Sequence, residues 1–445
     1  MKTMNKSSVS PSKRYRILAA GMLAQFCAGI IYMWSVFQKP VVEYLSWDSG
    51  AAKLTSSIML AMFVLGIIAG GFVQDKLGPK KATLIGSCLI GCGMASTSFV
   101  TAGAPWLIYI TYSIIGGLGV GTVYTSTIAA VQKWFPDKRG FASGMIVSSF
   151  GFSLVAFAPL AESMLYSDLG VRYTFLVFGI SFLVICSVCA MFISNPPEGH
   201  IPAGHSPKRH PSAGHSPEGR PSAGHSPEGH PSTGHSPEGH PSTGHVANLP
   251  ASTRRQYSPR EILKTKQFYL LAGALVFTLP AYFILNPVFR TLGVERGLRE
   301  EIALLGVMIT GISSAAGRLV VSWVSDKTGR KTAMIAIAAM ILIASLVMIV
   351  GRDLVFLICI VVISFGFGGA SGVYSAMTAE SFGTKYGGTN FGLVMLGFCA
   401  SALIFPTVSN SLTAGGSYTS SFIVAAATCV VAMVLVLLMK NPGKQ

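Results

Sequence analysis

The chain has 445 residues, of which 51% are hydrophobic and 11% are charged. A soluble domain carries about 25% charged residues, so this composition excludes one or two ordinary soluble domains. The net charge of +16 does not indicate a nucleic-acid partner, because basic residues have another use in loops between apolar spans. We therefore expect the lipid bilayer to be the solvent for most of the chain.

Transmembrane helices dominate the predicted structure. A helix that crosses the hydrocarbon core needs about 20 mostly apolar residues, and the ends of such stretches are uncertain by about 4 residues. Twelve stretches qualify: roughly 15–38, 55–73, 82–100, 105–131, 141–163, 171–193, 267–289, 301–324, 333–350, 354–378, 389–411 and 417–439. The sequence thus predicts an all-α membrane protein with 12 transmembrane helices in two six-helix halves.

Basic residues are unevenly shared between the predicted loops. If the N-terminus is cytoplasmic, 25 of the 33 Lys and Arg fall in internal segments, seven in external loops and one, Arg318, within a span. Internal loops of membrane proteins are enriched in positive charge. We therefore expect a multi-pass protein of the cell membrane with both termini in the cytoplasm.

A hydrophilic segment, residues 195–260, separates the N-terminal bundle (1–194) from the C-terminal bundle (261–445). It contains a ten-residue repeat, as in PSAGHSPEGR and PSTGHSPEGH, and all nine histidines of the chain. A segment rich in Pro, Gly, Ser and His cannot form a packed core. We interpret it as a cytoplasmic tether, with metal binding or pH sensing as the alternative.

The two halves repeat the same landmarks. Between spans 2 and 3 stands Asp75-Lys76-Leu-Gly-Pro-Lys, and between spans 8 and 9 stands Asp326-Lys327-Thr-Gly-Arg330-Lys. A second pair is GVGTVYTST around Tyr124 and GASGVYSAM around Tyr374. Such repetition indicates duplication and the two-half architecture of many transporters.

The D-K-x-G loops resemble the signature loop of the major facilitator superfamily. The resemblance implies that Asp75, Lys76, Asp326, Lys327 and Arg330 act as a gate, holding the cytoplasmic helix ends in the outward-facing state. Alternatively, the basic residues only set topology. Glu380, near the cytoplasmic end of span 10, is expected at a solvated helix end rather than in this gate.

Arg318 is the candidate centre of the substrate site. It lies about 12 Å along its helix from the loop at Asp326, at 1.5 Å per residue, which places it near mid-membrane. A charged group there marks function by default, and the guanidinium suits a carboxylate. The alternative is that Arg318 snorkels to the cytoplasm or pairs with the backbone of a neighbouring helix. Ser314, one turn away on the same face, could line the same site or serve close packing.

Tyrosines could complete the site. Tyr124 lies 9 residues before Lys133, at nearly the depth of Arg318, and Tyr374 holds the matching place in the second half. Tyr32 lies in the outer half of span 1. Each could instead be a packing or interface residue.

A narrower resemblance connects the chain with the oxalate/formate antiporter family, which includes lactate-type monocarboxylate transporters. It rests on WFPDKRGFASG (134–144) after Tyr124, YMWSVFQKP (32–40), GRLVVSWVSDKTGR (317–330) and NFG (390–392). It implies that Arg318 binds the anion, with Tyr124 and Tyr32 as the family's span 4 and span 1 aromatics.

The chain departs from this family at Phe398. The oxalate exchanger has a lysine eight residues after the Asn of its NFG-like start, as second partner for a dianion. Counting eight from Asn390 without gaps gives Phe398, which would face an apolar substituent. One buried cation balances one carboxylate, because a second unpaired buried charge would cost several kcal/mol.

The sequence therefore predicts a monomeric secondary transporter of small organic anions, most of all monocarboxylates. Proton symport and anion exchange both stay open, as do an oxalate-type dicarboxylate antiporter and a transporter-like sensor. A neutral sugar or drug carrier is disfavoured by Arg318. The sequence offers no metal-ligand cluster or nucleophile motif near a span end, so we expect no enzyme, metal or cofactor.

Overall fold

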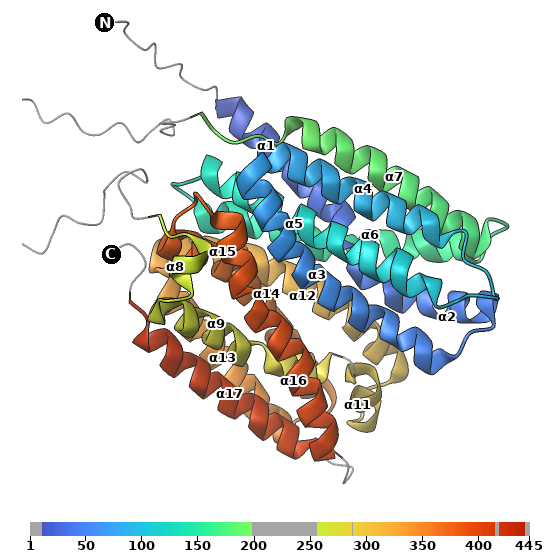
Figure 1. Cartoon of the computed structure of the whole chain (residues 1–445). Helices are drawn as coiled ribbons and strands as arrows, with labels where there is room; N and C mark the ends of the chain where they lie inside the picture. The colour runs from blue at the N-terminus through green and yellow to red at the C-terminus, as the bar shows by residue number, and fades with distance from the viewer. Residues whose placement is uncertain (1–10, 198–255, 287, 414–417, 441–445) are drawn as a thin grey trace, which may run out of the picture.

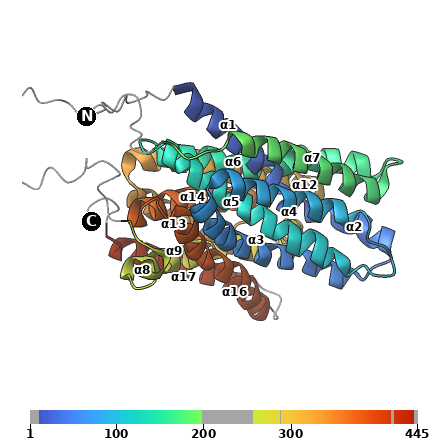
Figure 2. The ribbon, with the colours of Figure 1, turned by 45° about the horizontal axis from the view of Figure 1, so that its top comes forward.

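The computed structural model describes residues 11–197, 256–286, 288–413 and 418–440, and within these ranges the protein is helical without a strand. The repeat of the hydrophilic segment lies outside the described residues. Figure 1 shows two helical bundles side by side, α1 to α7 from the first part of the chain and α8 to α17 from the second. Figure 2 shows the same division after a turn of the molecule.

The first half contains six helical columns. Span 1 is built from α1 (Pro11–Ala28), η1 (Gly29–Met33) and α2 (Trp34–Leu45), and span 4 from the π-helical η2 (Tyr109–Gly116) and α5 (Gly117–Trp134). The other columns are single helices: α3 (Ser49–Leu77), α4 (Pro79–Thr97), α6 (Arg139–Leu165) and α7 (Gly170–Phe192).

The second half repeats this plan after the short α8 (Pro259–Ile262). Span 7 consists of α9 (Lys266–Thr278), α10 (Pro280–Leu285) and α11 (Phe289–Glu295), and span 11 of α15 (Gly387–Val394) and α16 (Leu396–Leu412). The single helices are α12 (Glu300–Thr328), α13 (Arg330–Val350), α14 (Asp353–Phe382) and α17 (Thr419–Leu438).

Eleven of these columns are long and apolar enough to cross a membrane. The twelfth expected span corresponds to α4, whose 19 residues include Lys80 and Lys81 in the first turn. Two charges in so short a helix lower its mean hydropathy. The helix packs against α5 and α7 within the bundle, so it completes the six columns of the first half.

The two halves meet at one end of the bundles. The start of α1, the α3–α4 and α12–α13 turns and the end of α17 lie at this end, which we call the terminal face (Figure 1). Here α3 packs on α15, and α6 packs on α12. At the other end, α2 and α11 pack chiefly against elements of their own half. The closure of the protein is therefore concentrated at the terminal face.

Small residues allow the close approach of helices. A methyl group added to Gly144 of α6 would lie 2.6 Å from the Arg318 carbonyl oxygen on α12, and one added to Gly71 of α3 would lie 2.6 Å from the Gly388 oxygen. Within the first half, a methyl group at Gly121 would lie 2.6 Å from the Ile67 nitrogen. Real Cβ atoms do not come this close, so only glycine lets these backbones touch.

Gly121→Ala should lower stability. The added methyl group would push α5 away from α3, and overpacking of this kind costs about 1–3 kcal/mol. We expect the apparent melting temperature of the purified protein in detergent to fall by several degrees.

Gly311→Ala is the matched control, because a methyl group at this helical position of α12 would meet no atom within 4 Å. Alanine is the better helix former by about 1 kcal/mol, so this variant should melt at or above the temperature of the parent. Equal melting temperatures for both variants would contradict the close packing of α3 and α5.

Candidate functional site

Arg318 lies at the boundary between the two halves. It belongs to α12 in the second half, but its guanidinium donates to oxygens of the first half: the Tyr32 hydroxyl at 3.2 Å and the Val147 carbonyl at 3.4 Å. Arg318 is 4% exposed, its Nε has no hydrogen-bond partner, and no described carboxylate pairs with it. Five N–H donors therefore make only two long hydrogen bonds to protein.

Local structure in span 1 places Tyr32 beside Arg318. The 3-10 segment η1 interrupts the span, and the Tyr112 hydroxyl donates to the Ile30 carbonyl within it at 3.1 Å. Gly29 allows η1 to approach α6, since a methyl group there would lie 2.5 Å from the Phe150 carbonyl oxygen. The ring of Tyr32 packs edge-on against Phe150, with centroids 5.3 Å apart.

Tyr124 also comes close to Arg318, near enough for a direct electrostatic interaction. Its helix, α5, is joined to α1 by Gln25, which donates to the Tyr124 carbonyl at 3.1 Å and to the Thr127 hydroxyl at 2.9 Å. The Tyr124 ring contacts Phe150 edge-on at 5.2 Å. The structure therefore brings Arg318, Tyr32 and Tyr124 together, and their role in substrate binding stays a prediction.

A third tyrosine, Tyr282 of α10, reaches the same place and was missed by the sequence analysis. It interacts electrostatically with both Arg318 and Tyr32. A signal for it exists in the sequence: Tyr282 in PAYFILNPVF of span 7 corresponds to Tyr32 in IIYMWSVF of span 1. The first span of each half thus contributes one tyrosine.

The remaining candidates lie around this group at different distances. The Ser314 hydroxyl is buried without a hydrogen-bond partner, one turn from Arg318. Phe398 of α16 packs edge-on against Phe283 at 5.2 Å and lies 6.2 Å from Phe367, the ring that stacks on Tyr282. Ser314 is thus adjacent to Arg318, Phe398 is connected to Tyr282 through Phe367, and the part of both in substrate binding stays a prediction.

The structure does not bring Tyr374 to Arg318. Tyr374 is fully buried in α14, and its hydroxyl lies 3.4 Å from the Thr278 hydroxyl of α9. No contact with Arg318 is seen, so its expected part in substrate binding stays a prediction. The equivalence of Tyr124 and Tyr374 in sequence is not matched by equivalent surroundings.

At the terminal face, Asp75 connects the end of α3 with the start of α15. Its carboxylate accepts hydrogen bonds from the Thr389 N–H at 2.9 Å, the Thr389 hydroxyl at 2.7 Å and the Gly388 N–H at 3.3 Å. A carboxylate at a helix N-terminus satisfies free N–H groups and complements the helix dipole. Asp75 therefore joins the two halves.

Asp326 makes the corresponding contact in the opposite sense. At the end of α12, it accepts hydrogen bonds from the Gly140 N–H at 2.9 Å and the Phe141 N–H at 2.7 Å, at the start of α6. Gly140 and Phe141 belong to the motif WFPDKRGFASG, so this contact explains the structural role of that part of the motif. Each D-K-x-G aspartate thus binds the start of a helix in the other half.

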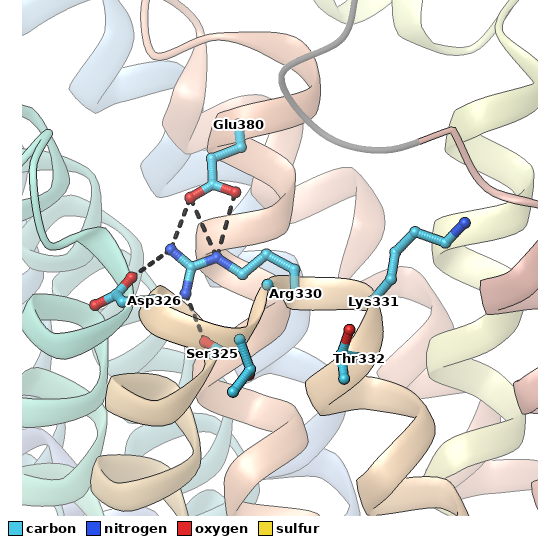
Figure 3. A pocket seen from close by; sticks show the side chains of 8 residues that line it. Ser325, Asp326, Arg330, Lys331, Thr332 and Glu380 are labelled. Carbon is cyan, nitrogen blue, oxygen red and sulfur yellow. Dashed lines mark hydrogen bonds and ion pairs between the residues drawn. The ribbon is translucent and has the colours of Figure 1, made fainter. Parts of the chain in front are cut away.

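Arg330 adds a charge network to the Asp326 contact alone (Figure 3). Its guanidinium donates to Asp326 at 2.6 Å, to Glu380 at 2.7 Å and to the Ser325 hydroxyl at 2.5 Å. These groups line a hollow of about 330 Å³ at the terminal face. Glu380 therefore pairs with Arg330, and its expected place at a merely solvated helix end was wrong, because α14 ends beside the α12–α13 turn.

The two gate lysines do not take part in these contacts. Lys76 is exposed, and Lys327 lies over the exposed Trp323 ring of its own helix, 3.8 Å from the ring centroid. Among these five residues, Asp75 and Asp326 make the hydrogen bonds between the halves, and Arg330 pairs with Asp326 within the second half. The gating role of all five residues stays a prediction.

Comparison with known proteins gives a consistent result. A sequence profile of the Major Facilitator Superfamily matches residues 19–406 and 271–445. The oxalate:formate antiporter of Oxalobacter formigenes is 22% identical over 424 residues, which are 95% of this chain and 90% of the relative. Monocarboxylate transporter 13 of Rattus norvegicus is 27% identical over 149 residues, 34% of each chain.

Solved structures show the same fold. The transporter FucP in the outward conformation superposes with a TM-score of 0.67 at 14% identity, over 95% of this chain and 98% of that chain. The human organic anion transporter MFSD10 superposes with a TM-score of 0.65 at 13% identity, over 96% of this chain and 100% of that chain. At these identities the likeness concerns the fold alone.

Asp326→Ala should loosen the terminal face. It removes two backbone hydrogen bonds and the ion pair with Arg330, and each hydrogen bond to a charged group contributes about 1.5–3 kcal/mol. The population with separated halves should rise roughly tenfold or more. Spin labels at the exposed positions Lys138 and Lys385 should then report a longer and broader distance distribution in pulsed electron paramagnetic resonance.

Asp168→Ala is the control, since this exposed aspartate lies between α6 and α7 at the opposite end. Both proteins need the exposed Cys88 and Cys92 replaced before labelling. If Asp326→Ala and Asp168→Ala gave the same distances as the parent, Asp326 would not hold the two halves together.

Proposed function

The chain belongs to the Major Facilitator Superfamily, and from this premise we propose that it transports small organic anions, above all monocarboxylates of the lactate and formate type, by alternating access. The observation that carries the proposal is Arg318, a buried cation between the halves with no carboxylate partner in the described chain. The relationship to the oxalate:formate antiporter and to monocarboxylate transporters supports the same class of substrate.

The energetics of Arg318 favour an anion as its partner. A buried charge without a counter-charge costs several kcal/mol, and the two long hydrogen bonds that Arg318 donates to Tyr32 and Val147 offset only part of this. A carboxylate could accept two parallel N–H bonds from one guanidinium and neutralise its charge. A neutral sugar would leave the charge uncompensated.

The contacts of Arg318 also suggest how binding is coupled to movement. Its donors reach oxygens of the first half, while its helix belongs to the second half. An anion bound at Arg318 would therefore contact both halves, and transporters of this kind rock their halves about such a site. We propose that the terminal face is cytoplasmic, as the distribution of Lys and Arg predicts, and that the Asp75 and Asp326 contacts close it.

The single buried cation favours monocarboxylates over dicarboxylates. Phe398, where the oxalate exchanger is expected to carry a lysine, belongs to a ring cluster with Phe283 and Phe367. A second carboxylate in that direction would lose its hydration without gaining a partner. An apolar substituent would instead be accommodated there.

Proton symport and anion exchange are both compatible with this site. Uptake driven by an imposed pH gradient without substrate on the far side would establish symport. Uptake that requires a carboxylate on the far side would establish exchange.

Arg318→Gln should abolish carboxylate counterflow in proteoliposomes. The variant retains two hydrogen-bond donors but loses the charge, so we expect at least a hundredfold loss of transport efficiency for labelled lactate, equivalent to about 3 kcal/mol. Arg318→Lys should recover only part of it, because an ammonium lacks the planar fork.

Arg172→Gln serves as the control for loss of one positive charge, since Arg172 is exposed at the start of α7. It should transport like the parent. Undiminished lactate counterflow by Arg318→Gln would remove Arg318 from the binding role and the proposal with it.

Phe398→Lys should improve the recognition of dicarboxylates. A second cation near Arg318 would pair the second charge of oxalate, so unlabelled oxalate should inhibit lactate counterflow at roughly tenfold lower concentration than in the parent. Phe398→Met keeps an apolar side chain of adaptable shape and should not show this shift. A parent protein that prefers oxalate to lactate would refute the argument from Phe398.

A further inference from the structure

Tyr282 occupies in the second half the place that Tyr32 occupies in the first. Both lie in the short middle segment of an interrupted span: Tyr32 in η1 of span 1, and Tyr282 in α10 of span 7. Pro280 in the first turn of α10 contributes to the interruption of span 7, because proline lacks the N–H that a continuous helix would need. Tyr32 accepts a hydrogen bond from Arg318, and Tyr282 lies near the same guanidinium.

The hydroxyl of Tyr282 is available for a ligand. Tyr282 is half-buried, stacks on Phe367 of α14 where this helix packs on Ser314 of α12, and lies near Arg318 and Tyr32. Its hydroxyl makes no hydrogen bond to any other described residue. By contrast, the Tyr32 hydroxyl accepts from Arg318 at 3.2 Å and still has its own proton to donate. Two tyrosine O–H groups, one from each half, are thus near the Arg318 guanidinium.

The ring of Tyr282 is held in a fixed direction. It stacks on Phe367 of α14 with centroids 3.7 Å apart and ring planes inclined by 11°. Phe283 packs edge-on against the same Phe367 at 5.7 Å and against Phe398 at 5.2 Å. Tyr282 therefore combines a fixed polar tip near Arg318 with an apolar wall that extends to Phe398.

We propose that Tyr282 is a specificity-determining residue of the substrate site. Its hydroxyl donates to the carboxylate held by Arg318, alongside that of Tyr32, and its ring forms with Phe398 the wall against which the substituent of the substrate lies. The favoured substrate is then a monocarboxylate with a short apolar substituent, such as propionate, over formate, which has none. This inference rests on the proposed function.

Two variants separate the two roles of Tyr282. Tyr282→Phe keeps the stacked ring and removes the hydroxyl. It should therefore lower the affinity for formate, lactate and propionate by the same factor of roughly tenfold, because all three share the carboxylate. Tyr282→Leu also removes the ring, so it should additionally reduce the preference for propionate over formate by several-fold. A merely structural tyrosine would not produce this pattern.

The measurement is ligand-induced stabilisation of the purified full chain. The apparent melting temperature is followed against the concentration of formate, lactate and propionate, because a ligand that binds the folded state raises it in proportion to ln(1 + [L]/Kd). Tyr269→Phe, at an exposed position of α9 in the same span, is the matched control and should behave like the parent. Tyr282→Phe decides the outcome if Tyr282→Leu does not fold.

The possible results distinguish the two proposals. If the parent binds these carboxylates but Tyr282→Phe binds all of them with unchanged affinity, Tyr282 does not contact the carboxylate and this inference alone fails. If the parent prefers formate to propionate, the apolar wall does not select the substrate. If the parent is stabilised by no carboxylate, the proposed function fails and this inference falls with it.

Discussion

Arg318 carries a charge that the protein itself does not neutralise, and the arrangement of both halves around it follows from that. Water or an acidic side chain normally stabilises the positive charge of a guanidinium. Arg318 is buried away from water and pairs with no described carboxylate. What surrounds it are oxygens without formal charge, from Tyr32 and Val147 of the first half. These groups stabilise the cation only in part, which is the physical basis for the anion that we propose as its partner.

The helix irregularities near Arg318 have a common function. Long regular helices would present ridges of side chains at fixed intervals, whereas the interruptions in spans 1, 7 and 11 set side-chain directions independently on each side of the break. Glycines then let α6 lie directly on α12 beside the guanidinium. Rigid rings, Phe150 in the first half and Phe367 in the second, fix the tyrosines. The tyrosine rings are thus held in fixed directions, and under the proposed function this would lower the entropic cost of binding an anion.

The terminal face is closed by the same kind of contact twice, an aspartate bound to the start of a helix, but the two contacts differ in strength. Asp75 and Asp326 each bind the start of a helix in the opposite half. Only Asp326 is joined by Arg330 and, through it, by Glu380. The first half has Pro79 and Ala130 where Arg330 and Glu380 stand in the second, judged from the spacing to Asp75 and Tyr124. Duplication of the fold therefore did not produce two equal contacts, and both the Arg330 ion-pair network and Arg318 lie in the second half.

The sequence by itself determined the class of the protein and its most important charge. Twelve apolar stretches, the repeated D-K-x-G loops and one arginine within a span are visible without a structure, because a charge in hydrocarbon is costly enough to be rare. Which residues face that arginine was decided only by tertiary structure. In spans that are apolar on all sides, periodicity does not reveal helix rotation, so Tyr124 and Tyr374 were equivalent in sequence and differ in space, while Tyr282 and Glu380 gained their partners through helix breaks and neighbouring helix ends.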